Sequence, residues 1–141
     1  MFIDYAEINS RAVNMLLSSK KHISSIPPEL KSLVELRVSQ INRCAYCLDL
    51  HSKEARREGA SQQKLDCLPA ASESGLFTPK ELSALAWAEK ITNIQNGLNQ
   101  EMEVNALFDH FNQEEIVDLT LVIALMNCLN RLAISMGDRP R

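Results

Sequence analysis

The chain has 141 residues, of which 45% are hydrophobic and 23% are charged, an ordinary composition for one globular domain with a full core. Its formal net charge of −3 argues against nucleic-acid binding, which needs a basic surface. Only four glycines and five prolines occur, and this scarcity of turn residues favours long helices over many short strands. No segment alternates convincingly with period two, so the sequence predicts an all-α fold.

No basic segment followed by an apolar run opens the chain, so we expect no signal peptide. The longest uninterrupted apolar run covers residues 121–126, far fewer than the ~20 residues of a membrane-spanning helix. We therefore expect a soluble, cytoplasmic protein with no membrane partner and no nucleic-acid partner.

Helical periodicity and helix-end signals recur along the chain. The first predicted helix would turn one apolar stripe inward, formed by Ile8, Ala12, Met15 and Leu16. Pro28 suits the first turn of the second helix, and Gly59 is the expected left-handed stop of the third. Thr78 begins a later helix as the N-cap of a capping box with Glu81. Together these signals predict six or seven helices, at about residues 5–20, 28–41, 44–58, 61–72, 78–96, 100–111 and 113–136.

The last predicted helix is apolar around most of its circumference over residues 116–134. Such a helix is either central to the fold or shared with another subunit. Polar groups within it need partners when they are buried, so we interpret them as hydrogen-bonded anchors between helices or subunits: Asn127, Asn130 and Arg131.

Two thiols and an imidazole lie close together in the sequence, at Cys44, Cys47 and His51. In a helix these positions share one face, and the imidazole could accept or share the proton of the Cys47 thiol. Cysteines one turn apart can also form a disulfide with little backbone change. The first turn of a helix favours a thiolate, because free N–H groups and the positive end of the dipole lie there. The pattern indicates redox chemistry.

A zinc site is the main chemical alternative, because Cys44, Cys47 and His51 are all permitted ligands. Its second half is missing, since the remaining histidines and cysteines are isolated: His22, His110, Cys67 and Cys128. The two isolated cysteines lie in apolar helical contexts and are interpreted as small core residues. Redox chemistry is therefore favoured over a zinc site at these residues.

Residues 36–51, with the sequence LRVSQINRCAYCLDLH, resemble the signature of the alkyl hydroperoxidase D-like (AhpD-like) core of the carboxymuconolactone decarboxylase superfamily. The likeness continues through residues 53–59, 76–89 and 123–133. It implies an AhpD-like helical bundle forming a single domain over residues 1–141, with the signature core at about 30–90. It also implies an activity without a metal or another cofactor, such as flavin or haem, and a homo-oligomer, either a trimer or a hexamer built as a trimer of dimers.

In that family the second cysteine attacks the peroxide, the first resolves it, and the histidine belongs to a proton relay. The resemblance therefore implies these roles for Cys47, Cys44 and His51. We expect an antioxidant thiol peroxidase that reduces hydroperoxides through a dithiol–disulfide cycle, with a dithiol protein or small thiol as reductant. A thiol–disulfide oxidoreductase with little peroxide turnover is the alternative, because both activities need an accessible thiol of low pKa.

The acidic member of the relay departs from the family pattern. Better-known members place a glutamate where this chain has Ser32. Glu35, from the next turn, is the preferred replacement, and Glu54, three residues after His51, is the other. The sequence leaves both open.

Overall fold

The computed structural model describes residues 1–141 and contains only helices and their connections. The predicted all-α fold is confirmed. There are nine α-helices: α1 (Tyr5–Ile8), α2 (Ser10–Ser18), α3 (Pro28–Asn42), α4 (Ala45–Arg57), α5 (Gln62–Asp66), α6 (Ala71–Ser74), α7 (Pro79–Thr92), α8 (Gln100–Leu107) and α9 (Gln113–Met136). Three short 3₁₀ helices accompany them: η1 (Ser19–His22), η2 (Leu68–Ala70) and η3 (Ile94–Asn96).

The expected count of six or seven helices is wrong, because two predicted helices are divided. Residues 5–20 form α1, α2 and the start of η1, and the division falls at Asn9, whose side chain accepts the N–H of Ala12 and caps α2. Residues 61–72 form α5, η2 and the start of α6. Here Pro69 has no N–H with which to continue an α-helical ladder, so the chain tightens into a 3₁₀ turn.

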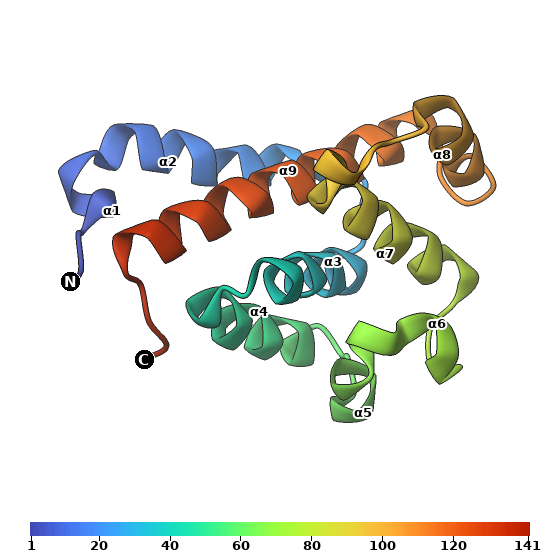
Figure 1. Ribbon diagram of the computed structural model, residues 1–141, viewed down its shortest axis with the longest axis horizontal. Helices are drawn as coiled ribbons and strands as arrows, with labels where there is room; N and C mark the ends of the chain where they lie inside the picture. Colours follow the sequence, from blue (N-terminus) through green and yellow to red (C-terminus); the bar gives the residue numbers. More distant parts are fainter.

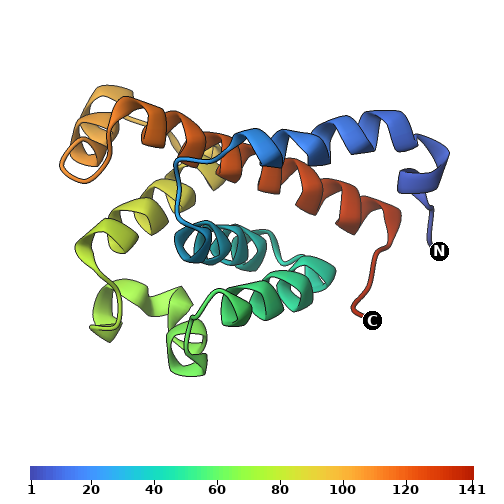
Figure 2. The ribbon, with the colours of Figure 1, turned by 180° about the vertical axis from the view of Figure 1, so that it is seen from behind.

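The predicted inward stripe of the first helix is also wrong. Ile8 and Met15 are 75% and 69% exposed, and Val13 is the only buried residue of α1 and α2. Both views of the ribbon show α2 running beside α9 at one edge of the molecule (Figures 1 and 2). Most apolar side chains of this N-terminal segment therefore face away from the core of the chain.

Helix α3 is the centre of the fold, lying between α4 and α9 in Figure 1 and packing on α4, α7 and α9. Its residues contribute to two apolar clusters, one represented by Val34 and Val38 and the other by Leu33 and Leu36. Because α3 is covered on several sides, even its charged Glu35 is buried. The fold thus places a carboxylate in the interior, where it needs partners.

Helix α9 buries one face against α3, α4 and α7, but Val117, Leu121 and Ile134 on its other side are about half exposed. It is therefore not enclosed on all sides within one chain. By length and composition alone α9 would be able to cross a membrane, yet here its buried face forms part of the core.

Polar side chains join α3 to α9. Asn42 donates from Nδ2 to the side-chain oxygens of Asn127 and Asn130, at 2.9 and 3.0 Å, and Asn130 donates to Oγ of Ser39 at 3.1 Å. The predicted role of the two α9 asparagines as anchors between helices is confirmed. Arg131 is exposed and bonds only to Asn127 on its own helix, so it does not link α9 to another helix of this chain.

Candidate active site

The two cysteines lie where the chain turns from α3 into α4. Arg43 makes the turn in the left-handed conformation, with φ of 57°, and Cys44 then caps α4. The sulfur of Cys44 accepts the backbone N–H of Cys47 at 3.3 Å. The Cα atoms of this pair are 5.2 Å apart, and the sulfur atoms are joined in a disulfide. Both cysteines are buried, at 1% and 2% exposed, so neither is the accessible thiol that the sequence analysis expects.

His51 follows one turn later on α4 and is 2% exposed. Its Nδ1 lies 2.8 Å from Oε2 of Glu54, on the same helix, and 3.8 Å from Oε2 of Glu35, on α3. The structure therefore brings both candidate acids to the same ring nitrogen. Only the contact with Glu54 is within hydrogen-bond distance.

The hydrogen bond with His51 holds the pKa of Glu54 below its usual range, and the positive charges of Lys20 and Arg57 act in the same direction against burial. Glu54 is consequently an ionised carboxylate at neutral pH, and an ionised carboxylate can only accept hydrogen bonds. The proton must then lie on Nδ1 of His51. In the neutral ring this leaves Nε2 as the nitrogen that can take up a proton.

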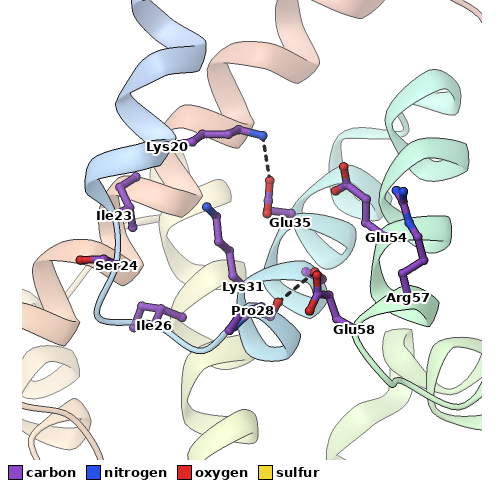
Figure 3. Close-up of a pocket in the computed structure, with 11 residues that line it drawn as sticks. Lys20, Ile23, Ser24, Ile26, Pro28, Lys31, Glu35, Glu54, Arg57 and Glu58 are labelled. Atoms are coloured by element: carbon purple, nitrogen blue, oxygen red, sulfur yellow. Dashed lines mark hydrogen bonds and ion pairs between the residues drawn. The ribbon is translucent and has the colours of Figure 1, made fainter.

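A third segment reaches the site, and no sequence motif points to it. Lys20, from η1, places its Nζ 3.2 Å from Oε2 of Glu35. Lys20 and Glu35 both line an open cavity of about 540 Å³. Figure 3 shows Lys20 approaching Glu35 from one side of this cavity while Glu54 and Arg57 stand on the other. No local pattern marks Lys20, because its partner lies on another helix.

Ser32, at the position of the family's relay glutamate, also lines this cavity. Its Oγ donates to the carbonyl oxygen of Pro28 on its own helix, at 2.9 Å. The hydroxyl is therefore committed to the backbone and does not approach His51. The acidic groups beside the imidazole come from Glu35 and Glu54 instead.

The groups that could hold a divalent cation are Glu35, His51 and Glu54, whose ligand atoms all lie within 4.8 Å of one another. This set differs from the three ligands of the zinc alternative, and the ammonium of Lys20 already stands beside Glu35 as a positive charge. The other histidines and cysteines lie outside the site. His22 and His110 are exposed, and two thiols are free and partly exposed: Cys67 and Cys128.

The model of the carboxymuconolactone decarboxylase family matches residues 11–90, which include the two paired cysteines, His51 and the groups around it: Lys20, Ser32, Glu35 and Glu54. The chain belongs to this family. The uncharacterized protein YdfG of Bacillus subtilis is a relative of this chain and is 34% identical over 139 residues, covering 97% of this chain and 95% of the relative.

Solved structures identify the chain more closely as an AhpD-like member of the carboxymuconolactone decarboxylase superfamily. A protein of unknown function from Agrobacterium tumefaciens, described as a candidate antioxidant defence protein AhpD, matches with a TM-score of 0.92 and 30% identity, over 99% of this chain and 97% of that one. An uncharacterized peroxidase-related protein from Ralstonia eutropha with an alkylhydroperoxidase AhpD core matches with a TM-score of 0.83 and 19% identity, over 96% of this chain and 74% of that one. The latter likeness concerns the fold alone.

Proposed function

We propose that this AhpD-like protein is a thiol peroxidase that reduces hydroperoxides through Cys47 and Cys44. One observation carries the proposal: a paired set of thiols at the start of α4 is followed, one turn later, by the buried His51, whose Nδ1 is bound to a carboxylate. Such an arrangement leaves the other ring nitrogen free to act as a base toward a thiol. The description of the Agrobacterium tumefaciens structure, which refers to antioxidant defence, supports the same chemistry.

In the proposed cycle, His51 takes the proton of the Cys47 thiol, and the resulting thiolate attacks the terminal oxygen of the hydroperoxide. The O–O bond breaks, the leaving alkoxide takes the proton back from His51, and Cys47 becomes a sulfenic acid. The thiol of Cys44 then displaces water and forms the disulfide. In sum, one hydroperoxide and two thiols give one alcohol, one water and one disulfide. A dithiol protein or small thiol restores both thiols by exchange.

The proposed site requires no metal or other cofactor, because the thiols carry the electrons and the imidazole moves the proton. We assign the relay to His51 with Glu54 as its hydrogen-bonded partner and Glu35 as the second acid. A cytoplasmic location would fit this cycle, since a reducing environment regenerates the thiols.

We also propose that the functional form is a homo-oligomer, a trimer or a hexamer. Its support is the apolar surface left outside the core, on the N-terminal helices and on α9, represented by Ile8, Met15, Leu121 and Ile134. Closed symmetry would bury such surface between identical copies. Light scattering of the purified protein tests this, and a stable monomer at micromolar concentration would contradict it.

The decisive experiment adds a hydroperoxide to the reduced protein and follows disulfide formation by mass spectrometry. We expect a Cys44–Cys47 disulfide with consumption of one equivalent of peroxide. Cys47→Ser should abolish consumption, whereas Cys44→Ser should leave a sulfenic acid on Cys47 that a dimedone probe captures. The control is a variant without the two free thiols, Cys67→Ser with Cys128→Ser, which should react as the parent does.

Two results would contradict the peroxidase assignment. Peroxide consumption that survives in Cys47→Ser would place the chemistry elsewhere. Rapid exchange with a dithiol protein, without measurable peroxide consumption, would favour the thiol–disulfide oxidoreductase instead.

A further inference from the structure

The carboxylate of Glu35 stands between two groups that carry protons. Its Oε2 is 3.2 Å from Nζ of Lys20 and 3.8 Å from Nδ1 of His51. The side chain of Glu35 is only 6% exposed, whereas that of Lys20 is 30% exposed. Lys20 therefore extends from the surface to a buried carboxylate beside the imidazole.

The imidazole cannot satisfy both acids. Nδ1 of His51 has one proton to donate, and Glu54 accepts it at 2.8 Å. A buried carboxylate without a hydrogen-bond donor is strongly unfavourable, so Glu35 needs another partner. Lys20 supplies one, because an ammonium has three protons to donate and accepts none.

The other charged groups near this cluster do not replace Lys20. They lie on α3, at the C-terminal end of α4 and on α9. None of them forms an ion pair with Glu35: Lys31, Arg57, Glu58 and Asp118. Arg57 acts electrostatically on Glu54, as Lys20 also does, and Lys31 acts on Asp118, which is already bonded to Ser25. Without Lys20, the remaining donor close to Glu35 is Nδ1 of His51.

We propose that Lys20 is a positioning residue of the active site, which holds Glu35 away from His51 so that the imidazole pairs with Glu54 and can serve Cys47. This inference rests on the proposed function, since it assigns a role in activating the same thiol. It joins three segments of the chain: η1 supplies the ammonium, α3 the buried acid, and α4 the imidazole with its partner. Removal of the ammonium would leave Glu35 competing with Glu54 for one proton and would make the surroundings of the Cys47 thiolate more negative.

The test measures alkylation of Cys47 by iodoacetamide across pH in the reduced protein, quantified on the Cys47 peptide by mass spectrometry. This reaction needs no peroxide, so its outcome is independent of whether peroxide is the substrate. In Lys20→Met we expect the alkylation rate at neutral pH to fall roughly tenfold and the midpoint of the pH profile to rise. Both changes correspond to an increase of about one unit in the pKa of the Cys47 thiol. Lys20→Arg should keep both close to the parent values, because a guanidinium can also donate to Glu35.

Two further variants distinguish positioning from a structural role. Lys21→Met changes the exposed neighbour on η1 and should leave the profile unchanged. The double variant Lys20→Met with Glu35→Gln should recover most of the lost rate, because a neutral amide needs no counter-ion. A parental pH profile in Lys20→Met would overturn the proposal. So would a double variant no faster than Lys20→Met, since the effect would then not run through Glu35.

Discussion

The imidazole of His51 is bound through Nδ1 to the carboxylate of Glu54, at 2.8 Å and three residues further along the same helix. Glu35, on the neighbouring helix, lies 3.8 Å from the same nitrogen. The two glutamates are therefore not equivalent. The closer one orients the ring, and the more distant one is neutralised by Lys20.

Glu54→Gln should lower the rate of Cys47 oxidation by roughly tenfold, because the carboxylate fixes the orientation and the tautomer of the His51 ring. Its amide can donate as well as accept, so it no longer fixes the proton on Nδ1 of His51. Glu35→Gln is the matched comparison and should cost less, because its contact with the ring is longer than a hydrogen bond. Stopped-flow measurement of sulfenic acid formation compares them. A larger loss in Glu35→Gln would reverse this assignment of the two acids.

Acid should destabilise the fold through carboxylates whose pKa is lowered in the folded state. Hydrogen bonds from the hydroxyl and backbone N–H of Ser25 lower the pKa of Asp118 below its ordinary value of 3.8, and the bond with His51 lowers that of Glu54 below 4.5. A lowered folded pKa contributes stability above the ordinary value, and this is lost as the pH falls through the folded value. Urea unfolding should show constant stability from neutral pH to about pH 5, then a decline.

Asp118→Asn checks the origin of that decline. The variant should be less stable by about 1.5 kcal/mol at neutral pH, because it loses charge-assisted bonds to Ser25 at 2.7 and 3.0 Å. Its stability should also depend less on pH below pH 5. An unchanged slope would show that other carboxylates control acid unfolding.

Asn130→Ala should destabilise the protein by roughly 2 kcal/mol, because the side chain is fully buried and links Ser39 to Asn42. The loss loosens the contact of α9 with the helix that carries Glu35. Asn105→Ala is the control, since Asn105 is exposed on α8 and should change stability by less than about 0.5 kcal/mol. Equal effects of both variants on urea unfolding would contradict an anchoring role for Asn130.

Arg43→Gly should stabilise the protein by about 0.5–1 kcal/mol, because the left-handed conformation is strained for arginine and relaxed for glycine. This net value already subtracts the larger conformational entropy that glycine loses on folding. The same change should leave the formation of the Cys44–Cys47 disulfide unaffected, since the backbone path is retained. A lower melting temperature would show that the Arg43 side chain itself contributes to the folded state.

Treatment with a chelator should leave peroxide consumption unchanged, because the proposed chemistry belongs to the thiols and the imidazole. Glu35 belongs to the group of side chains that could bind a divalent cation, and it is also the ion-pair partner of Lys20. An added cation would therefore compete with the ammonium of Lys20 for Glu35. Activity lost on chelation and restored by zinc would instead assign a catalytic metal to Glu35, His51 and Glu54.

Much of the helical pattern could be predicted because its signals are local. The capping box of Thr78 and Glu81 marks the start of α7 and is confirmed. The division at Asn9 could not be predicted, because an asparagine between the apolar positions of a helix looks like an ordinary solvent-facing residue. In the structure its side-chain oxygen accepts the N–H of Ala12 and caps the next helix. Exposure of Ile8 and Met15 could not be predicted either, since periodicity identifies an apolar face but not what covers it.

The candidate site, too, could be predicted only in part. The relation of Cys44, Cys47 and His51 follows from spacing along one helix, and the structure has them in one stretch of α4 and its cap. The ranking of Glu35 and Glu54 depends on how α3 packs against α4, and the contribution of Lys20 depends on where η1 lies. These are relations between segments, which a single sequence does not encode as a local pattern.

The contacts that lead from Lys20 through Glu35 to His51 run from the surface to the interior and involve polar groups alone. A single exchange at position 20 can thus alter how reactive the buried sulfur is while the interior stays intact. Among proteins sharing this architecture, differences in thiol reactivity should then track the charge carried by the first 3₁₀ turn more closely than the composition of the core. The N-terminal segment would adjust the chemistry that the central helices make possible.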